Sequence, residues 1–251
     1  MIELANVAFS YGGGLDFVAD FGVEDGELTA IVGENGSGKT TLLKLAVGEL
    51  IPQKGEVLVD GKPLSRIKRK DLARLVSCFP QSRPIPDMTA TDAVLLGRYP
   101  YTRGSLRLPA GELEAAATAL ARVGAVEFAD RNMKTLSYGE RQRVYLAMQV
   151  AQNTQNCLFD EPTNFLDAAA KFEVLELMSG LAKEGKCAVC VLHDLSLALK
   201  YADRLIVMKK GRVFADGSPR ELCESGAIDK AFGVRVKRFE ENGERVYGIL
   251  K

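Results

Sequence analysis

A glycine-rich run at residues 33–40, with the sequence GENGSGKT, has the clearest chemical meaning in this chain. Its three glycines allow the backbone to turn tightly, so that successive N–H groups can point at phosphate oxygens. Lys39 can reach the outer phosphates of a nucleotide, and the Thr40 hydroxyl can bind Mg²⁺. A chance cluster of glycines is the alternative. The residues predicted to contact nucleotide in this region are Gly33, Asn35, Gly36, Ser37, Gly38, Lys39, Thr40 and Thr41.

Two acidic residues follow a short apolar run, 157–159, further along the chain. Asp160 at the tip of such a strand can orient Mg²⁺ through its water shell, and Glu161 can polarise the water that attacks a phosphate. The competing interpretation is a pair of exposed turn acids before Pro162, because Asp and Glu are common before turns. From these residues alone, the two interpretations have equal weight.

Residues 136–142, LSYGERQ, open a long helical pattern. Ser137 is a favourable helix cap, and Glu140 three positions later completes a capping box. A well-capped helix is therefore a sufficient explanation for this motif. A helix N-terminus that carries Ser137 and Gly139 can also bind an anion, because its free N–H groups and the helix dipole attract negative charge.

The elements around the glycine run have the order that phosphate binding requires. A short apolar strand, residues 28–32, precedes the run, and a helical pattern follows it at residues 42–46. The opening residues alternate as a strand does up to a turn at 12–14. Residues 15–32 are predicted to form a hairpin with its turn at Asp25-Gly26. Further strands are predicted at 56–59, 76–79, 157–160, 187–192 and 204–208.

A stretch of different character, about residues 85–150, interrupts the series of strands. It is rich in alanine and other helix formers, and residues 111–123 predict an amphipathic helix that ends at Gly124. We therefore expect an α/β core with an inserted helical subdomain rather than two independent domains. The C-terminal residues, 226–251, are expected to form a small appendix with a hairpin turn at Asn242-Gly243.

The composition is that of an ordinary globular protein without a charge excess. The 251 residues include 33 basic and 33 acidic side chains, whereas a nucleic-acid binder usually has a basic excess. The longest apolar run, 187–192, is far shorter than the ~20 residues that span a bilayer, and the N-terminus lacks the apolar segment of a signal peptide. We expect a cytoplasmic protein that does not bind nucleic acid.

Two smaller features have a simpler explanation than the functional one. Cys187 and Cys190 have the CxxC spacing of redox and zinc sites, but the chain has a single His, and residues three apart in a strand point to opposite faces. We expect both thiols in the core. The basic cluster at 66–70 is short and precedes Asp71 at a helix start, which favours a solvated helix face over a nucleic-acid or lipid site.

Together these motifs resemble the ATP-binding-cassette family, over roughly residues 1–225. The resemblance implies a P-loop NTPase core with an antiparallel β subdomain, the inserted helical subdomain at about 85–150, and ATP and Mg²⁺ as cofactors. The family's motifs occur here in order, as a Walker A loop at 33–40, a glutamine at Gln81, a signature at 136–140, a Walker B strand at 157–161, a D-loop at 164–167 and a histidine at His193.

The resemblance also implies roles for single residues. Glu161 is similar to the family's catalytic base, His193 to the residue that contacts the γ-phosphate, and Gln81 to the sensor of the Mg²⁺ site. Tyr11 matches the aromatic residue that stacks on adenine. The metal-site residues implied in this way are Thr40, Gln81 and Asp160.

Family geometry implies a homodimer that closes on two ATP molecules. Each nucleotide would lie between the Walker A loop of one copy and Ser137, Gly139 and Glu140 of the other. This chain departs from the family's signature at two positions, because Tyr138 replaces the usual first glycine and Glu140 the usual glutamine.

Four segments resemble the importer branch that serves iron-siderophore, haem and cobalamin permeases: 96–101, 160–167, 192–195 and 211–219. This likeness implies transmembrane permease subunits, a separate solute-binding protein, and a peripheral position on the inner face of the cell membrane. The helical subdomain and the neighbourhood of Gln81 would accept the permease's coupling helix. The alternative is a soluble cassette ATPase that serves protein or cofactor assembly without a permease.

Overall fold

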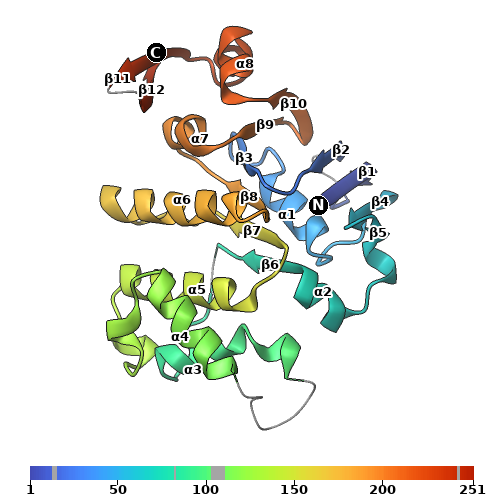
Figure 1. The fold of residues 1–251 in the computed structure, drawn as a ribbon. Helices are drawn as coiled ribbons and strands as arrows, with labels where there is room; N and C mark the ends of the chain where they lie inside the picture. Colours follow the sequence, from blue (N-terminus) through green and yellow to red (C-terminus); the bar gives the residue numbers. More distant parts are fainter. Residues whose placement is uncertain (13–15, 82, 103–110, 242–243) are drawn as a thin grey trace.

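One large mixed sheet organises the molecule. The structure, a computed structural model, describes residues 1–12, 16–81, 83–102, 111–241 and 244–251 (Figure 1). The order of strands in this sheet is β5-β4-β1-β2-β10-β9-β3-β8-β7-β6. These strands are β1 (Ile2–Phe9), β2 (Phe17–Val23), β3 (Leu28–Gly33), β4 (Lys54–Val59), β5 (Lys62–Pro63), β6 (Val76–Phe79), β7 (Asn156–Asp160), β8 (Cys187–Val191), β9 (Arg204–Lys209) and β10 (Arg212–Gly217).

The sheet has a parallel and a mainly antiparallel half. From β9 to β6 neighbouring strands are parallel, and every residue of β7 and β8 is buried, because helices cover both faces. β1 instead pairs antiparallel with β2 and β4, and buried residues alternate with exposed ones in β2. The predicted strands and the predicted α/β core with an antiparallel β part are confirmed.

Helices cover the sheet on both faces, and a helical subdomain lies beyond its β6 edge (Figure 1). In that subdomain α3, α4 and α5 enclose a hydrophobic core of their own, which includes Val94, Leu120 and Val144. The predicted helix at 111–123 is α4. The α-helices are α1 (Lys39–Ala46), α2 (Arg69–Leu75), α3 (Ala90–Leu96), α4 (Glu112–Arg122), α5 (Tyr138–Gln152), α6 (Ala168–Lys183), α7 (Leu195–Tyr201), α8 (Pro219–Glu224) and α9 (Ala227–Phe232). Short 3₁₀ turns are η1 (Leu64–Arg66), η2 (Tyr99–Tyr101), η3 (Val126–Phe128) and η4 (Met133–Thr135).

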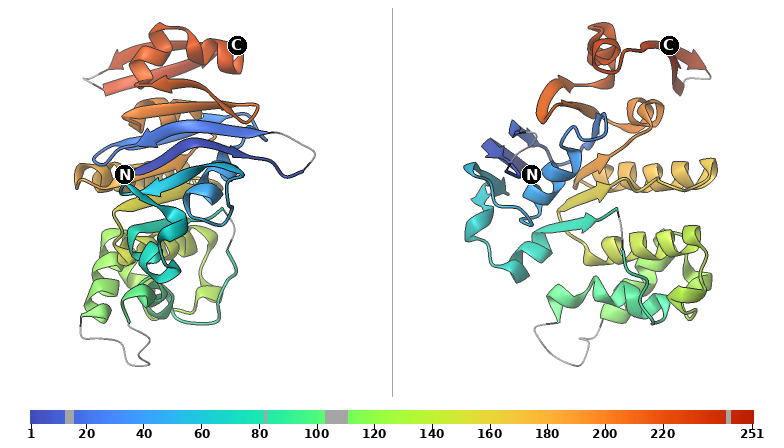
Figure 2. Two further views of the ribbon diagram at one scale, coloured as in Figure 1. Left: turned by 90° about the vertical axis from the view of Figure 1, so that its right-hand side faces the viewer. Right: turned by 180° about the vertical axis from the view of Figure 1, so that it is seen from behind.

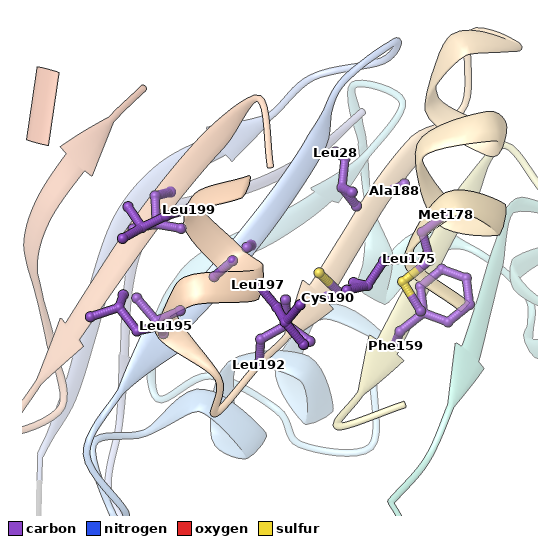
Figure 3. Packing of buried hydrophobic residues seen from close by; sticks show 14 of the residues in the cluster. Leu28, Phe159, Leu175, Met178, Ala188, Cys190, Leu192, Leu195, Leu197 and Leu199 are labelled. Atoms are coloured by element: carbon purple, nitrogen blue, oxygen red, sulfur yellow. The ribbon is translucent and has the colours of Figure 1, made fainter. Parts of the chain in front are cut away.

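The main core consists of two clusters, one on each face of the sheet. Leu175 and Met178 of α6 pack with Cys190 on one face, as Figure 3 shows. Leu43 of α1 packs with Cys187 on the other face. The two thiols of the CxxC sequence therefore point to opposite faces of β8, as predicted. In the described part of the chain no three or more His, Cys, Asp or Glu side chains are grouped so that they could hold a metal ion.

The predicted hairpin over residues 15–32 is wrong. The Asp25-Gly26 turn is present, but β2 pairs with β1 and β10, whereas β3 lies between β9 and β8. The reason is the burial of β3, whose residues from Leu28 to Val32 are buried on both faces and thus require a central position in the sheet. The turn connects two strands of one sheet that are not neighbours.

At the C-terminal end, β11 (Arg235–Glu241) and β12 (Glu244–Leu250) pair antiparallel into the predicted hairpin. Its expected turn at 242–243 lies outside the described residues. Figure 2 shows this hairpin at the end of the molecule farthest from the helical subdomain. The basic cluster at 66–70 is mostly exposed and leads into α2, as expected. Among the described residues no helix has the length and apolar character needed to cross a membrane.

Candidate functional site

The glycine-rich run forms a tight loop between β3 and α1. Gly36 and Gly38 have φ angles of 76° and 104°, a region that favours glycine. At the start of the loop, a Cβ atom on Gly33 would lie 2.3 Å from the carbonyl oxygen of Met208 and 2.6 Å from Oγ of Ser37. The loop therefore packs directly against β9, and only glycine fits at its first position.

Lys39 begins α1, and its side chain turns back into the loop. Nζ donates hydrogen bonds to the carbonyl oxygens of Gly33 at 2.7 Å and Glu34 at 3.0 Å. Burial lowers the pKa of this ammonium, and the charges of Glu161 and Asp160 oppose that effect. Because phosphate oxygens make stronger, charge-assisted hydrogen bonds, they can replace the two carbonyls as its partners.

A cleft of about 320 Å³ lies over the loop. Tyr11 is 63% exposed at the cleft, with its hydroxyl 3.5 Å from Oγ1 of Thr41. Its ring packs edge-to-face on Phe9 with centroids 4.8 Å apart, which leaves an aromatic face available to a base. The cleft is lined by Tyr11, Phe17, Asn35, Gly36, Gly38, Lys39, Thr40, Thr41 and Glu161.

Asp160 ends β7 and directly precedes Glu161, which lines the cleft. Asp160 and Glu161 are 5% and 9% exposed, so the interpretation as exposed turn acids is wrong. Burial, with a further contribution from the charge of Glu161, raises the pKa of Asp160 to about 6. Oδ1 of Asp160 and Oγ of Ser37 are buried without a hydrogen-bond partner in the described structure. Such unpaired oxygens are the ligands Mg²⁺ prefers, directly or through water, so the residues fit this ion.

Three side chains hold the carboxylate of Glu161. Nε2 of Gln81 donates to one oxygen at 2.6 Å, and Nδ2 of Asn164 donates to the same oxygen at 2.5 Å. Nε2 of His193 hydrogen-bonds to the other oxygen. The backbone N–H of Glu161 donates to the carbonyl oxygen of Val191 at 3.2 Å, and its φ of 51° fixes the residue in a turn. These hydrogen bonds fix the orientation of the carboxylate.

Asn164 is the functional candidate that sequence reasoning missed. The sequence places it in the D-loop segment without a role. Its backbone N–H donates to the carbonyl oxygen of Glu161 at 3.2 Å, and this turn aims its side-chain amide at the carboxylate. The spacing in the sequence could have indicated this role, because the side chain of an Asn three residues after an acidic residue in a turn can reach back to the carboxylate.

The signature residues Ser137, Gly139 and Glu140 form the start of α5. In the described part of the chain they are not among the residues that line the cleft over the glycine loop. The predicted capping box is present: Oγ of Ser137 accepts from the N–H of Glu140 at 3.3 Å, and Oε2 of Glu140 accepts from the N–H of Ser137 at 2.6 Å. These bonds lower the pKa of Glu140. A Cβ atom on Gly139 would meet nothing within 4 Å, so the helix start is open to an incoming group.

Tyr138, the residue that replaces a signature glycine, turns toward the D-loop segment. Its ring packs edge-to-face on Phe165, with centroids 5.7 Å apart and an interplanar angle of 83°. The two residues are 42% and 86% exposed. Tyr138 therefore makes an aromatic contact at the surface.

The cleft and the adjoining residue Asp160 combine groups that suit one kind of chemistry. The backbone and Lys39 can bind a chain of phosphates, and the free oxygen of Asp160 can hold a metal-bound water. Glu161 can take a proton from a water beside the last phosphate, and its three donors keep it in position. The arrangement can transfer a phosphoryl group from a nucleotide to water.

Comparison with known proteins agrees with a nucleotide-binding site in this cleft. A profile of the ABC transporter family matches residues 18–164. The chain is 38% identical to the ferric enterobactin transport ATP-binding protein FepC of Escherichia coli, over 85% of this chain and 79% of that protein. It is 42% identical to the hemin import ATP-binding protein HmuV of Nocardia farcinica, over 85% of this chain and 74% of that protein.

Solved structures agree with these sequence matches. A dimeric bacterial ABC transporter cassette superposes with a TM-score of 0.77 at 29% identity, over 88% of this chain and 99% of that chain. The protein cbiO1 from Clostridium perfringens, part of an ABC transporter complex, superposes with a TM-score of 0.78 at 26% identity, over 91% and 92% of the two chains.

Proposed function

The chain belongs to the ABC transporter family and is an ATPase of that family, and from this we propose that it powers a membrane importer for iron-siderophore, haem or cobalamin-type solutes. The relatives in the comparison are ATP-binding proteins for ferric enterobactin transport and hemin import, which supports this solute class. The observation that supports the ATPase site best is the carboxylate of Glu161, which three donors hold at the cleft above Lys39.

In this proposal ATP occupies the cleft over the glycine loop. Tyr11 stacks on the base, and the backbone of residues 33–38 with Lys39 binds the phosphates. Lys39 then exchanges its two backbone carbonyls for phosphate oxygens, which its present hydrogen bonds make possible. Thr40 and Thr41, which line the same cleft, supply hydroxyl groups beside the phosphates.

Thr40, Asp160 and Gln81 are the residues proposed to hold Mg²⁺, and the unpaired Oδ1 of Asp160 supports that role. When bound, the ion neutralises charge on the β- and γ-phosphates. The oxygen of the attacking water bonds to the γ-phosphorus, and Glu161 accepts a proton from this water. The bond between the γ-phosphorus and the bridging oxygen breaks, and ADP leaves with that oxygen. His193, beside Glu161, contacts the γ-phosphate in this proposal, and Gln81 links the metal to the same carboxylate.

Two copies are proposed to close head to tail on two nucleotides. Ser137, Gly139 and Glu140 lie away from their own cleft at an open helix start, so they are available to a nucleotide held by the partner copy. A helix N-terminus with free N–H groups binds a γ-phosphate well. The dimeric cassette in the comparison supports such an assembly.

An importer needs subunits that cross the membrane, and we propose that separate permease subunits, served by a solute-binding protein, do so. The cassette would then sit on the inner face of the membrane. The test is to express tagged Glu161→Gln in the native host, solubilise membranes with ATP and Mg²⁺ present, and identify what co-purifies by mass spectrometry. Recovery of a polytopic permease is the expected result. A soluble partner without any membrane protein would instead favour an assembly ATPase.

A further inference from the structure

The C-terminal hairpin leaves the outer edge of β11 open. β11 and β12 form a sheet of their own, so β11 has a neighbouring strand on one side only. The N–H of Val236 donates to Oδ1 of Asp229 at 2.9 Å, so it points away from β12. Because backbone groups alternate in direction along a strand, those of Arg238 and Glu240 point the same way. Among the described residues no backbone hydrogen bond from outside the hairpin reaches these two residues.

The charges along this edge have an order that matters for association. Residues 237–240 are exposed, and the sequence of residues 237–241 is KRFEE, with two basic residues before Phe239 and two acidic residues after it. In the described part of the chain neither Arg238 nor Glu240 takes part in an ion pair. Charged side chains normally protect an edge strand, because a row of like charges repels its own copy. A strand with a basic half and an acidic half lacks this protection against an antiparallel copy.

One face of the hairpin also exposes apolar side chains. Phe239 is 53% exposed, and Val246, directly opposite on β12, is 40% exposed. A Cβ atom on Gly248 would lie 3.0 Å from Cε2 of Phe239, so the ring extends over β12 and leaves the outer edge of β11 uncovered. Tyr247 on the opposite face is buried in the main core. The hairpin is thus fixed to the molecule by one face, while its other face and its outer edge stay exposed.

We propose that β11 pairs antiparallel with β11 of a second copy of this chain, with the two Phe239 residues opposite each other. In this register Arg238 of each copy is opposite Glu240 of the other. Each of these pairs exchanges both backbone hydrogen bonds through the groups that point away from β12. The two hairpins then form one continuous sheet, and Phe239 and Val246 of both copies lie on the same face of it.

The sequence of the edge favours a second copy over an unrelated strand. A matching strand needs an acidic residue opposite Arg238 and a basic residue opposite Glu240, and an antiparallel copy centred on Phe239 supplies both. A register centred one residue earlier or later would place two Arg238 or two Glu240 residues opposite each other. Like charges directly opposite are destabilising, so the charges select this one register.

The contact uses no residue of the nucleotide cleft, so it forms without ATP and does not depend on the proposed function. It is therefore distinct from the head-to-tail contact that closes on nucleotide. Pairing of one short strand buries little surface, so we expect weak and reversible association, with a Kd on the order of 10–100 µM. Both contacts are symmetric, so one two-fold axis can relate them within a single pair of copies.

Sedimentation equilibrium of the full chain in EDTA without nucleotide measures this association, at concentrations from about 5 to 300 µM. The wild type should form a reversible dimer. Arg238→Glu and Glu240→Arg should each weaken self-association at least about tenfold, because like charges then meet at two symmetric positions. The double variant Arg238→Glu/Glu240→Arg should restore it, because the acidic and basic residues have only exchanged places. Arg69→Glu, the same change at an exposed residue outside the hairpin, should associate as the wild type does.

A mixture of the two single variants separates a charge effect from a folding defect. In a mixed pair, Arg238→Glu supplies only acidic residues at the two positions and Glu240→Arg only basic ones, so every facing pair is complementary. Fluorescently labelled Arg238→Glu should therefore bind Glu240→Arg at least about tenfold more tightly than either variant binds itself. A variant with a disrupted hairpin could not recover binding in this way.

Each measurement has a result that overturns the contact. A wild type that stays monomeric throughout this concentration range would refute it, as would single variants that associate like the wild type. A double variant or a mixture that fails to associate would refute the register at Phe239 and the proposal with it. None of these results touches the proposed ATPase or importer function, because the hairpin lies outside the cleft. Conversely, failure of Glu161→Gln to dimerise with ATP would refute the head-to-tail contact and leave this one standing.

Discussion

Replacement of Asp160 by asparagine should stabilise the nucleotide-free protein. The Asp160 carboxylate is buried next to Glu161, and one of its oxygens has no partner in the described structure. Burial, with a further contribution from the charge of Glu161, raises the pKa of Asp160 from 3.8 to about 6. That difference corresponds to about 3 kcal/mol when the folded protein carries the charge. Water in the cleft screens part of it, so we expect a gain of about 1–2 kcal/mol, or about 2–8 °C in Tm.

The gain should depend on pH in a defined direction. The pKa of Asp160 is higher in the folded protein than in the unfolded chain. The contribution of this carboxyl group to wild-type stability is therefore fully present below pH 3.8 and is lost as the pH rises through about 6. The asparagine of the variant cannot titrate. The advantage of the variant should therefore be small near pH 4 and complete above pH 7.

Urea unfolding of the two proteins in EDTA, at several pH values, measures this advantage, with exposed Asp16→Asn as the control. The ATPase rate of Asp160→Asn should fall at the same time, because the oxygen proposed to hold the metal site is gone. A variant that is equally or less stable at pH 7.5 would refute the conclusion that Asp160 is held in an unfavourable environment. A gain that is the same at all pH values would refute the assignment of that gain to its charge.

Substitutions at three further positions test other parts of the structure. Lys39→Ala should lose nucleotide affinity in calorimetric titration, because the cleft loses its buried ammonium, and unchanged affinity would contradict the phosphate-loop role. Gly33→Ala should lower the free energy of unfolding by about 3 kcal/mol, since its methyl group would lie 2.3 Å from the Met208 carbonyl oxygen, and denaturant unfolding measures this loss. Tyr138→Ala should cost about 0.5–1 kcal/mol by the same assay because it removes the ring contact with Phe165, whereas Tyr138→Phe should cost nothing measurable.

Much of the fold could be predicted from local patterns in the sequence. The glycine run is constrained by its own backbone, and the capping box at Ser137 involves residues three positions apart, so both are visible in the sequence. The divergence of Cys187 and Cys190 follows from the alternation of side chains in a strand. Each of these features depends on neighbours in the chain.

Pairing between distant segments could not be predicted in the same way. The turn at Asp25-Gly26 suggests a hairpin, yet β3 takes the centre of the sheet because its residues are buried on both faces, and its partners β8 and β9 lie far away in the chain. The hydrogen bonds to the carboxylate of Glu161 are non-local as well, because Gln81 and His193 follow two other strands.

The measurement that tests the central claim most directly is the behaviour of Glu161→Gln with Mg²⁺ and ATP. Its ATP turnover should fall about 10²–10⁴-fold because the base is removed, while ATP binding persists. Size-exclusion chromatography with light scattering should then show a dimer that retains unhydrolysed ATP, whereas exposed Glu114→Gln should turn over as the wild type does. Wild-type turnover in Glu161→Gln, or a monomer with ATP bound, would contradict the proposed site.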